Sequence, residues 1–187
     1  VILGDSIVEQ LYCPALAGNN VFNAGISGAR VLESQDFLNE ILTLTQGPLV
    51  ILAMGVNDAF HLGETSPEQF EAGYQALAQA VLAANRRLVV VNLPPIEQDK
   101  PEGQRFDTAK AERYNAVVAA VADRLGGPLV DVRSLLTARR ESEGKAQTVD
   151  GVHLTPQAAV AWRNAVYTAA RDALNRPAPK DATPATP

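Results

Sequence analysis

The sequence predicts a three-layer α/β/α sandwich built on a five-stranded parallel β-sheet. Five short apolar segments alternate with longer segments in which apolar residues recur at helical spacing. Each short segment is apolar along its length, which is typical of strands that helices cover on both faces. The chain of 187 residues is long enough for one domain with a sizeable core and too short for two comfortable ones.

The first strand and the first helix are expected at the N-terminus. The apolar run that starts at Val1 leads into Gly4-Asp5-Ser6, so it should deliver Ser6 into a loop at the carboxyl end of a buried strand. A helix is predicted over residues 7–17, because the cluster Gly18-Asn19-Asn20 favours a turn after it. We expect Cys13, the single cysteine, to be a buried residue of this helix.

Four further strands follow the first. They are predicted at residues 21–25, 49–54, 88–93 and 129–132. The carboxyl ends of parallel strands lie on one edge of a sheet, where open α/β folds keep their active sites. The loops that follow these strands should therefore gather at that edge.

Four more helices are predicted between and after these strands. Gly47-Pro48 ends the first of them, the capping box Ser66–Gln69 begins the next, Gly126-Gly127-Pro128 follows the third, and Thr155-Pro156 begins the last. Polar residues 97–105 and 141–149 are expected to form loops. The expected core-facing residues are Leu38, Ile41 and Leu42; Phe70, Tyr74, Leu77, Val81 and Leu82; Tyr114, Val117, Val118, Val121 and Leu125; and Trp162, Ala165, Val166 and Ala169.

Composition narrows the class of partner. The net charge is −5 without basic clusters, so neither a nucleic-acid footprint nor an anionic membrane surface is indicated. No segment approaches the roughly 18 apolar residues of a membrane span. Residues 1–176 are expected to form the domain, and the Pro/Ala-rich residues 177–187 a flexible tail. Because Val1 lies inside an expected strand, we expect that an upstream segment was removed, which slightly favours a periplasmic or secreted location.

The expected loops hold the residues that acyl transfer needs. A serine hydroxyl is a weak nucleophile until a base takes its proton, and His153 could serve Ser6 in this way. Asp150 could hold the other ring nitrogen of that histidine. The backbone N–H groups of Ser6 and Gly28 and the amide of Asn57 could stabilise the oxyanion.

These residues lie in four blocks that resemble those of the SGNH hydrolases, also called GDSL esterases/lipases. The blocks are Gly4-Asp5-Ser6, residues 23–28, Gly55-Val56-Asn57-Asp58 and Asp150-Gly151-Val152-His153, and Ile7 stands where the family often has leucine. The resemblance runs from Val1 to about Leu174. It implies a flavodoxin-like sheet with strand order 2-1-3-4-5, and it implies the roles of nucleophile, acid, base and oxyanion donors given above.

The resemblance further implies a serine ester hydrolase that works through an acyl-enzyme without a cofactor or metal. We expect a small-molecule ester as the partner, with a short acyl group on a small or sugar alcohol. An O-acetyltransferase, a thioesterase or lysophospholipase with the same triad, and a catalytically silent binding module remain as alternatives. The sequence leaves the oligomeric state open.

Two further features have more than one interpretation. Asp58 and His61 repeat the spacing of Asp150 and His153, so the two pairs could be metal ligands, although no third histidine or cysteine cluster completes such a site. We instead expect Phe60 and His61 to line the acyl or alcohol pocket. Asp5 either contributes to substrate binding or braces its loop through backbone hydrogen bonds.

Overall fold

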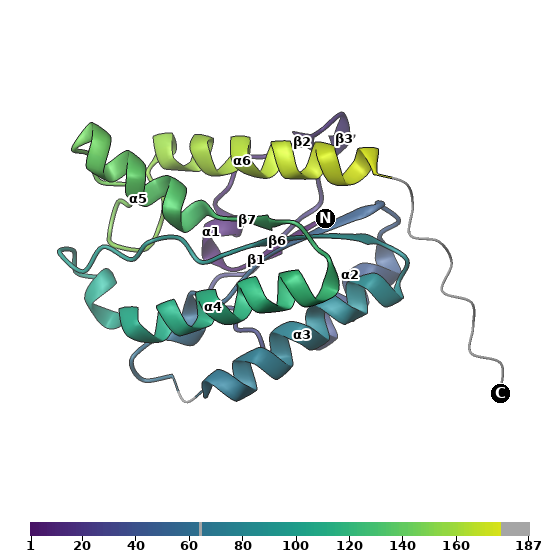
Figure 1. The fold of residues 1–187 in the computed structure, drawn as a ribbon, viewed down its shortest axis with the longest axis horizontal. Coiled ribbons are helices and arrows are strands. Elements are labelled where there is room, and N and C mark those ends of the chain that lie inside the picture. The colour runs from purple at the N-terminus through teal and green to yellow at the C-terminus, as the bar shows by residue number, and fades with distance from the viewer. Residues whose placement is uncertain (64, 177–187) are drawn as a thin grey trace.

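A computed structural model describes residues 1–63 and 65–176, so the expected tail lies outside the described residues. Its main sheet is parallel and consists, in spatial order, of β4 (Asn23–Gly25), β1 (Ile2–Gly4), β5 (Leu49–Ala53), β6 (Arg87–Val91) and β7 (Leu129–Val130). Apart from a short two-stranded hairpin, this is the order 2-1-3-4-5 along the chain. Figure 1 shows the sheet between two helical layers, which confirms the predicted fold class.

Each face of the sheet has its own apolar cluster, because successive strand residues point to opposite sides. Leu52 and Val90 belong to the cluster under α2 (Gln35–Leu44), α3 (Pro67–Ala83) and α4 (Thr108–Leu125), whereas Ile51 and Val89 belong to the cluster under α6 (Pro156–Asn175). Figure 1 shows α3 and α4 on one side of the sheet and α6 on the other.

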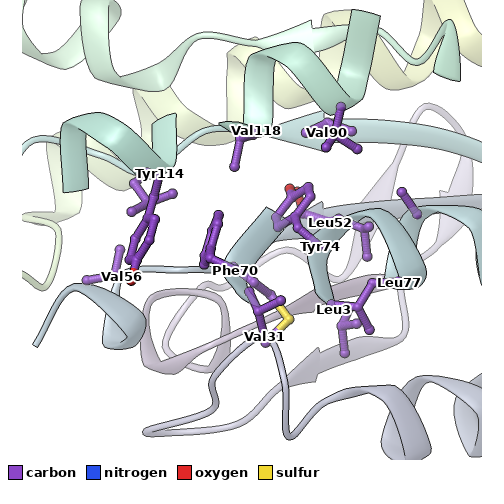
Figure 2. Packing of buried hydrophobic residues seen from close by; sticks show 14 of the residues in the cluster. Leu3, Val31, Leu52, Val56, Phe70, Tyr74, Leu77, Val90, Tyr114 and Val118 are labelled. Carbon is purple, nitrogen blue, oxygen red and sulfur yellow. The ribbon is translucent and has the colours of Figure 1, made fainter. Parts of the chain in front are cut away.

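Three aromatic rings dominate the larger cluster (Figure 2). Phe70 stacks on Tyr114 with ring centroids 3.9 Å apart and on Tyr74 at 5.7 Å. A Cβ atom added to Gly55 would lie 2.9 Å from the Phe70 ring, so this aromatic stack lies directly against the loop that follows β5. Loss of a buried phenylalanine typically costs about 3–5 kcal/mol of stability. The core therefore supports the segment that leads to Asn57.

The ends of the long helices follow the sequence signals. Ser66 and Gln69 exchange side-chain and backbone hydrogen bonds, which confirms the capping box at the start of α3. The Thr155 hydroxyl accepts the Ala158 N–H at 3.2 Å and starts α6. The first turn of α6 consequently follows His153 almost at once and fixes the end of the loop that carries it.

The helix predicted over residues 7–17 is wrong. Helix α1 spans only Ser6–Glu9, and an antiparallel hairpin of β2 (Ala15–Leu16) and β3 (Asn19–Asn20) follows it. Pro14 has no N–H to donate in a helix interior and would disrupt it. Cys13 is buried as expected, but it lies outside any helix.

The sequence reading also missed a helix, α5 (Val132–Glu143). The expected fifth strand stops at Val130, because Asp131 accepts the Ser134 N–H at 2.9 Å and begins the helix. The polar loop expected from residue 141 starts only after Glu143. Two buried residues, Val132 and Leu136, are too short an apolar stripe to reveal a helix by periodicity.

Candidate active site

The register of the sheet brings three loops to one edge. Gly4 at the end of β1 pairs with Gly25 of β4 on one side and with Ala53 of β5 on the other. Just beyond, the Ile26 N–H donates to the Gly4 carbonyl at 3.0 Å. The segments that hold Ser6, Gly28 and Asn57 therefore leave the sheet side by side, as parallel strand pairing requires.

Ser6, His153 and Asp150 form a hydrogen-bonded chain. The Nε2 atom of His153 lies 2.9 Å from the Oγ atom of Ser6, and its Nδ1 atom lies 2.6 Å from the Oδ2 atom of Asp150. An imidazole between a hydroxyl and a carboxylate can take the hydroxyl proton while the carboxylate stabilises the resulting cation. The arrangement thus has the geometry of an activated serine.

Backbone hydrogen bonds hold Asp150 in this orientation. Its Oδ1 atom accepts the N–H groups of Val152 and His153, both at 2.9 Å. Partial burial alone would raise the pKa of Asp150, but the hydrogen bonds from the His153 ring and from these two N–H groups outweigh it and lower the pKa below its ordinary value. The carboxyl group is therefore ionised at neutral pH, as the stabilisation of an imidazolium requires.

Asp5 is part of the support for Ser6. Its Oδ1 atom accepts the Ile7 N–H at 2.9 Å and caps α1, and the residue is only 2% exposed. Burial raises the pKa of this carboxyl to about 6, and the neighbouring Asp58 charge acts in the same direction. These contacts favour the loop-bracing interpretation over direct substrate binding.

Gly28 and Asn57 lie in loops that a hydrogen bond joins. The Asn57 Nδ2 atom donates to the Ala29 carbonyl at 3.0 Å, which uses one of the two amide hydrogens and leaves the other available. Gly28 is exposed with φ of +77°, and a Cβ atom there would meet nothing within 4 Å. The left-handed backbone, rather than lack of space, is what favours glycine at this position.

A hydrogen bond to the buried Asp58 side chain also joins these two loops. Asp58 is fully buried, and its Oδ2 atom accepts the Val31 N–H at 3.1 Å. Burial raises its pKa to about 6. The carboxylate is thus engaged with backbone, and within residues 1–63 and 65–176 no three His, Cys, Asp or Glu side chains gather as metal ligands would. Sequence reasoning did not find this bracing role, for which the only signal was the Asn-Asp pair after a buried strand.

Phe60 and His61 lie on the loop that follows Asp58. The Phe60 ring packs edge-to-face on Phe106 with centroids 5.4 Å apart, and the Arg105 guanidinium lies 4.8 Å from its centroid. The His61 backbone N–H donates to the Arg105 carbonyl at 3.0 Å, while its side chain is exposed. These contacts fix the segment on the loop before α4, and its part in substrate binding stays a prediction.

Sequence reasoning did not find a groove between the end of α1 and the start of α6. Ile7 and Leu154, which directly follow Ser6 and His153 in the sequence, line this pocket of about 370 Å³. Its other lining residues are Gln10, Leu11, Tyr12, Pro156, Ala159, Val160 and Arg163. The groove joins segments about 150 positions apart, so no local pattern could reveal it.

Comparisons with known proteins agree with this architecture. The family model of the GDSL-like lipase/acylhydrolase family matches residues 2–161. A comparison with curated proteins found no match. No helix among the residues that the structure describes is both long and apolar enough to span a membrane.

Solved structures with the same fold include several esterases. An acetyl xylan esterase named AlAXEase has 20% identity and a TM-score of 0.79, with 90% of this chain and 97% of that chain covered. A lipase/acylhydrolase from Enterococcus faecalis has 14% identity and a TM-score of 0.78, with 91% and 94% covered. A catalytic mutant of an acetylxylan esterase from Geobacillus stearothermophilus has 16% identity and a TM-score of 0.73, with 90% and 91% covered.

Proposed function

The chain belongs to the GDSL-like lipase/acylhydrolase family and is a carboxylic ester hydrolase, and we propose that it cleaves short-chain esters through an acyl-enzyme on Ser6. The single observation that carries this proposal is the chain from Ser6 through His153 to Asp150, with heavy-atom separations of 2.9 and 2.6 Å. Both separations lie within the range that proton transfer and imidazolium stabilisation need.

In the first half of the reaction, the Ser6 Oγ atom bonds to the ester carbonyl carbon. The carbonyl π electrons move to oxygen, and His153 Nε2 takes the hydroxyl proton. The N–H groups of Ser6 and Gly28 and the free amide hydrogen of Asn57 stabilise the oxyanion. The bond to the alcohol oxygen then breaks, and the imidazolium returns its proton to the departing alcohol.

In the second half, water replaces the alcohol. The water oxygen bonds to the acyl carbon while His153 takes a proton from the water. The bond between that carbon and Ser6 Oγ breaks, and Ser6 regains a proton from the imidazolium. The acid is released, and Asp150 keeps the imidazole oriented through both halves.

The groove between α1 and α6 suits the alcohol portion of the substrate. His153 protonates the departing alcohol, so the alcohol must lie near the imidazole, and Leu154, the residue after His153, lines the groove. Tyr12, which is 80% exposed, offers an aromatic face, and Arg163 offers hydrogen-bond donors. Apolar faces edged by hydroxyls are typical of sugars. Acetyl esters of carbohydrates therefore fit best, in keeping with the names of two structural neighbours.

The test combines substrate profiling with active-site labelling. p-Nitrophenyl esters from acetate to octanoate and an acetylated xylo-oligosaccharide are supplied to the enzyme, and a fluorophosphonate adduct is mapped by mass spectrometry. We expect fastest turnover of acetate, release of acetate from the oligosaccharide, and labelling at Ser6. Absence of both labelling and turnover would overturn the proposal. If an added acceptor alcohol outcompetes water, the acyl-enzyme transfers its acyl group mainly to alcohols, and the proposal that the enzyme cleaves short-chain esters by hydrolysis on Ser6 is wrong.

A further inference from the structure

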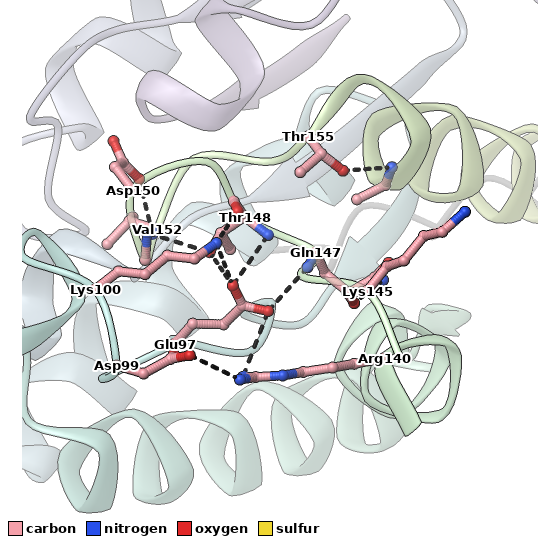
Figure 3. A network of polar contacts seen from close by, with 12 residues as sticks. Glu97, Asp99, Lys100, Arg140, Lys145, Gln147, Thr148, Asp150, Val152 and Thr155 are labelled. Carbon is pink, nitrogen blue, oxygen red and sulfur yellow. Dashed lines mark hydrogen bonds and ion pairs between the residues drawn. The ribbon is translucent and has the colours of Figure 1, made fainter. Parts of the chain in front are cut away.

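Glu97 is a buried acid beneath the loop that carries Asp150 and His153. It lies in the polar segment after β6 that was expected to form a loop, yet its side chain has no exposed surface. Figure 3 shows its carboxylate pointing toward Gln147 and Thr148. An unpaired buried carboxylate would be strongly unfavourable, so its partners are informative.

The partners of Glu97 are concentrated on the start of this loop. The Gln147 N–H donates to Oε1 at 2.8 Å, and the Thr148 hydroxyl and N–H donate to Oε2 at 2.5 and 3.3 Å. Lys100 Nζ lies 2.8 Å from Oε2, and Arg140 Nη1 lies 3.4 Å from Oε1. Each carboxylate oxygen thus receives a cation and at least one donor from the loop.

A relay of contacts leads from Glu97 to Asp150 and its neighbour. The Thr148 hydroxyl oxygen accepts the Gly151 N–H at 3.1 Å, while the Gly151 carbonyl accepts the Glu97 N–H at 2.9 Å. Gly151 has φ of +114°, and a Cβ atom there would lie 2.4 Å from the Gly103 nitrogen. The backbone of this turn is therefore clamped tightly against the segment that Glu97 begins.

The loop is closed on itself as well. The Val149 N–H donates to the His153 carbonyl at 2.8 Å, and the Thr155 N–H donates to the Gln147 carbonyl at 2.9 Å. A displacement of residues 147 and 148 must therefore move the His153 backbone. Glu97 holds the base of a closed loop whose other end carries the acid and the base.

The Glu97 carboxyl group is ionised at neutral pH. Burial alone would raise the pKa of this carboxyl, but the hydrogen bonds from Lys100, Thr148 and the Gln147 N–H outweigh burial and lower the pKa to about 2. The loop is consequently held by an ion, whose hydrogen bonds are stronger than those of a neutral acceptor.

We infer that Glu97 is a positioning residue of the esterase: its carboxylate sets the place of Asp150 and His153 through Gln147 and Thr148. This inference rests on the proposed function, because it names the residue that holds the proposed catalytic acid and base in place. Glu97 does not touch the reacting atoms. Displacement of a catalytic group by about 1 Å can lower the rate on the order of 100-fold, so the anchor should affect kcat more than substrate binding.

The first test compares Glu97→Gln with Glu71→Gln. Glutamine keeps the shape but removes the charge and replaces an acceptor with donors that face Gln147 or Thr148. Glu71→Gln makes the same chemical change in an exposed ion pair with Arg124, between α3 and α4. We expect Glu97→Gln to lower kcat on p-nitrophenyl acetate about 10- to 100-fold with little change in KM, and Glu71→Gln to match the wild type.

The second test uses Thr148, so that the inference survives a Glu97 variant that fails to fold. Thr148→Val removes the hydroxyl that links Glu97 to the Gly151 N–H, whereas Thr148→Ser keeps it. We expect a loss of kcat in the valine variant that serine largely restores. The proton NMR signal of His153 Nδ1–H, which reports its hydrogen bond to Asp150, should shift or broaden in the valine variant alone.

The outcomes separate this inference from the proposed function. If the folded Glu97 and Thr148 variants keep wild-type kcat and an unchanged His153 signal, Glu97 serves only stability and the inference is wrong. If the wild type itself lacks esterase activity, the proposed function fails. In that case the His153 signal still decides whether Glu97 positions the loop.

Discussion

The side-chain amide of Asn57 donates a 3.0 Å hydrogen bond to the Ala29 carbonyl, across 28 positions of the chain. The bond locks the loop after β5 to the loop after β4, which contains Gly28. It also fixes the direction of the second amide hydrogen. The two loops that supply oxyanion donors in the proposed mechanism are thereby mutually oriented before substrate arrives, which is the preorganisation that such stabilisation requires.

Replacement of Asn57 should therefore impair the chemical step. We expect Asn57→Ala to lower kcat on p-nitrophenyl acetate on the order of 10²–10³-fold, because the oxyanion loses a donor. Steady-state kinetics gives kcat and KM, and circular dichroism confirms that the variant is folded. A change confined to KM would assign Asn57 to substrate binding instead.

Asp58 predicts an unusual dependence of stability on pH. Its pKa is about 6 in the folded protein against an ordinary 3.8, so the protonated form is favoured by folding. The stability it contributes is complete below the ordinary value and is lost as pH rises through about 6. The difference between these two pKa values corresponds to about 3 kcal/mol.

Asp58→Asn removes this titration while an amide oxygen can still accept the Val31 N–H. Urea unfolding between about pH 4 and pH 7 should show the variant gaining stability relative to the wild type by an amount on the order of 3 kcal/mol as pH rises. Asp123→Asn, which changes an exposed acid of α4, should leave the wild-type curve unchanged. Parallel curves for the Asp58 variant and the wild type would refute the buried-acid account.

Tyr12 tests the proposed alcohol groove. We expect Tyr12→Ala to raise KM for an acetylated xylo-oligosaccharide about 3- to 10-fold, the loss of one stacking contact. Turnover of methyl acetate, whose alcohol is too small to reach the ring, should stay near wild type. Tyr167→Ala changes another exposed tyrosine, on α6 outside the groove, and is the matched control. Equal KM values for all three proteins on the oligosaccharide would place the alcohol elsewhere.

The sequence predicted the structure best where an apolar strand runs directly into a loop that carries a polar site residue. The buried strands before Ser6 and Asn57 are apolar throughout, so their ends and the loops after them could be placed from the pattern alone. Parallel topology accounts for the meeting of Ser6 with the loops that hold Gly28 and Asn57, because such a sheet leaves the loops after its strands on one edge. His153 lies beyond α5, in the loop before α6, so its pairing with Ser6 rested on the resemblance of the four blocks. The helix predicted over residues 7–17 was wrong because Pro14 interrupts it and a hairpin of β2 and β3 takes up Gly18-Asn19-Asn20, the turn signal on which the prediction rested.

The support around the site could not be read in this way. Glu97 stands among polar residues typical of an exposed loop, and only the folded chain places Gln147 and Thr148 against it. The bracing role of Asp58 likewise depends on its hydrogen bond from the Val31 N–H, which only the folded structure shows. Such pairings depend on loop conformations, which produce no repeating pattern of apolar residues in the sequence. Only the folded structure shows them.

The most direct test of the central claim is kcat on p-nitrophenyl acetate for Ser6→Ala beside the wild type. Ser142→Ala, which changes an exposed serine of α5, is the control for serine loss. An acyl-enzyme on Ser6 predicts a fall in kcat on the order of 10⁴-fold or more for Ser6→Ala and none for the control. If the folded Ser6→Ala protein kept most of its activity and a chelator abolished it, the reaction would not run through Ser6.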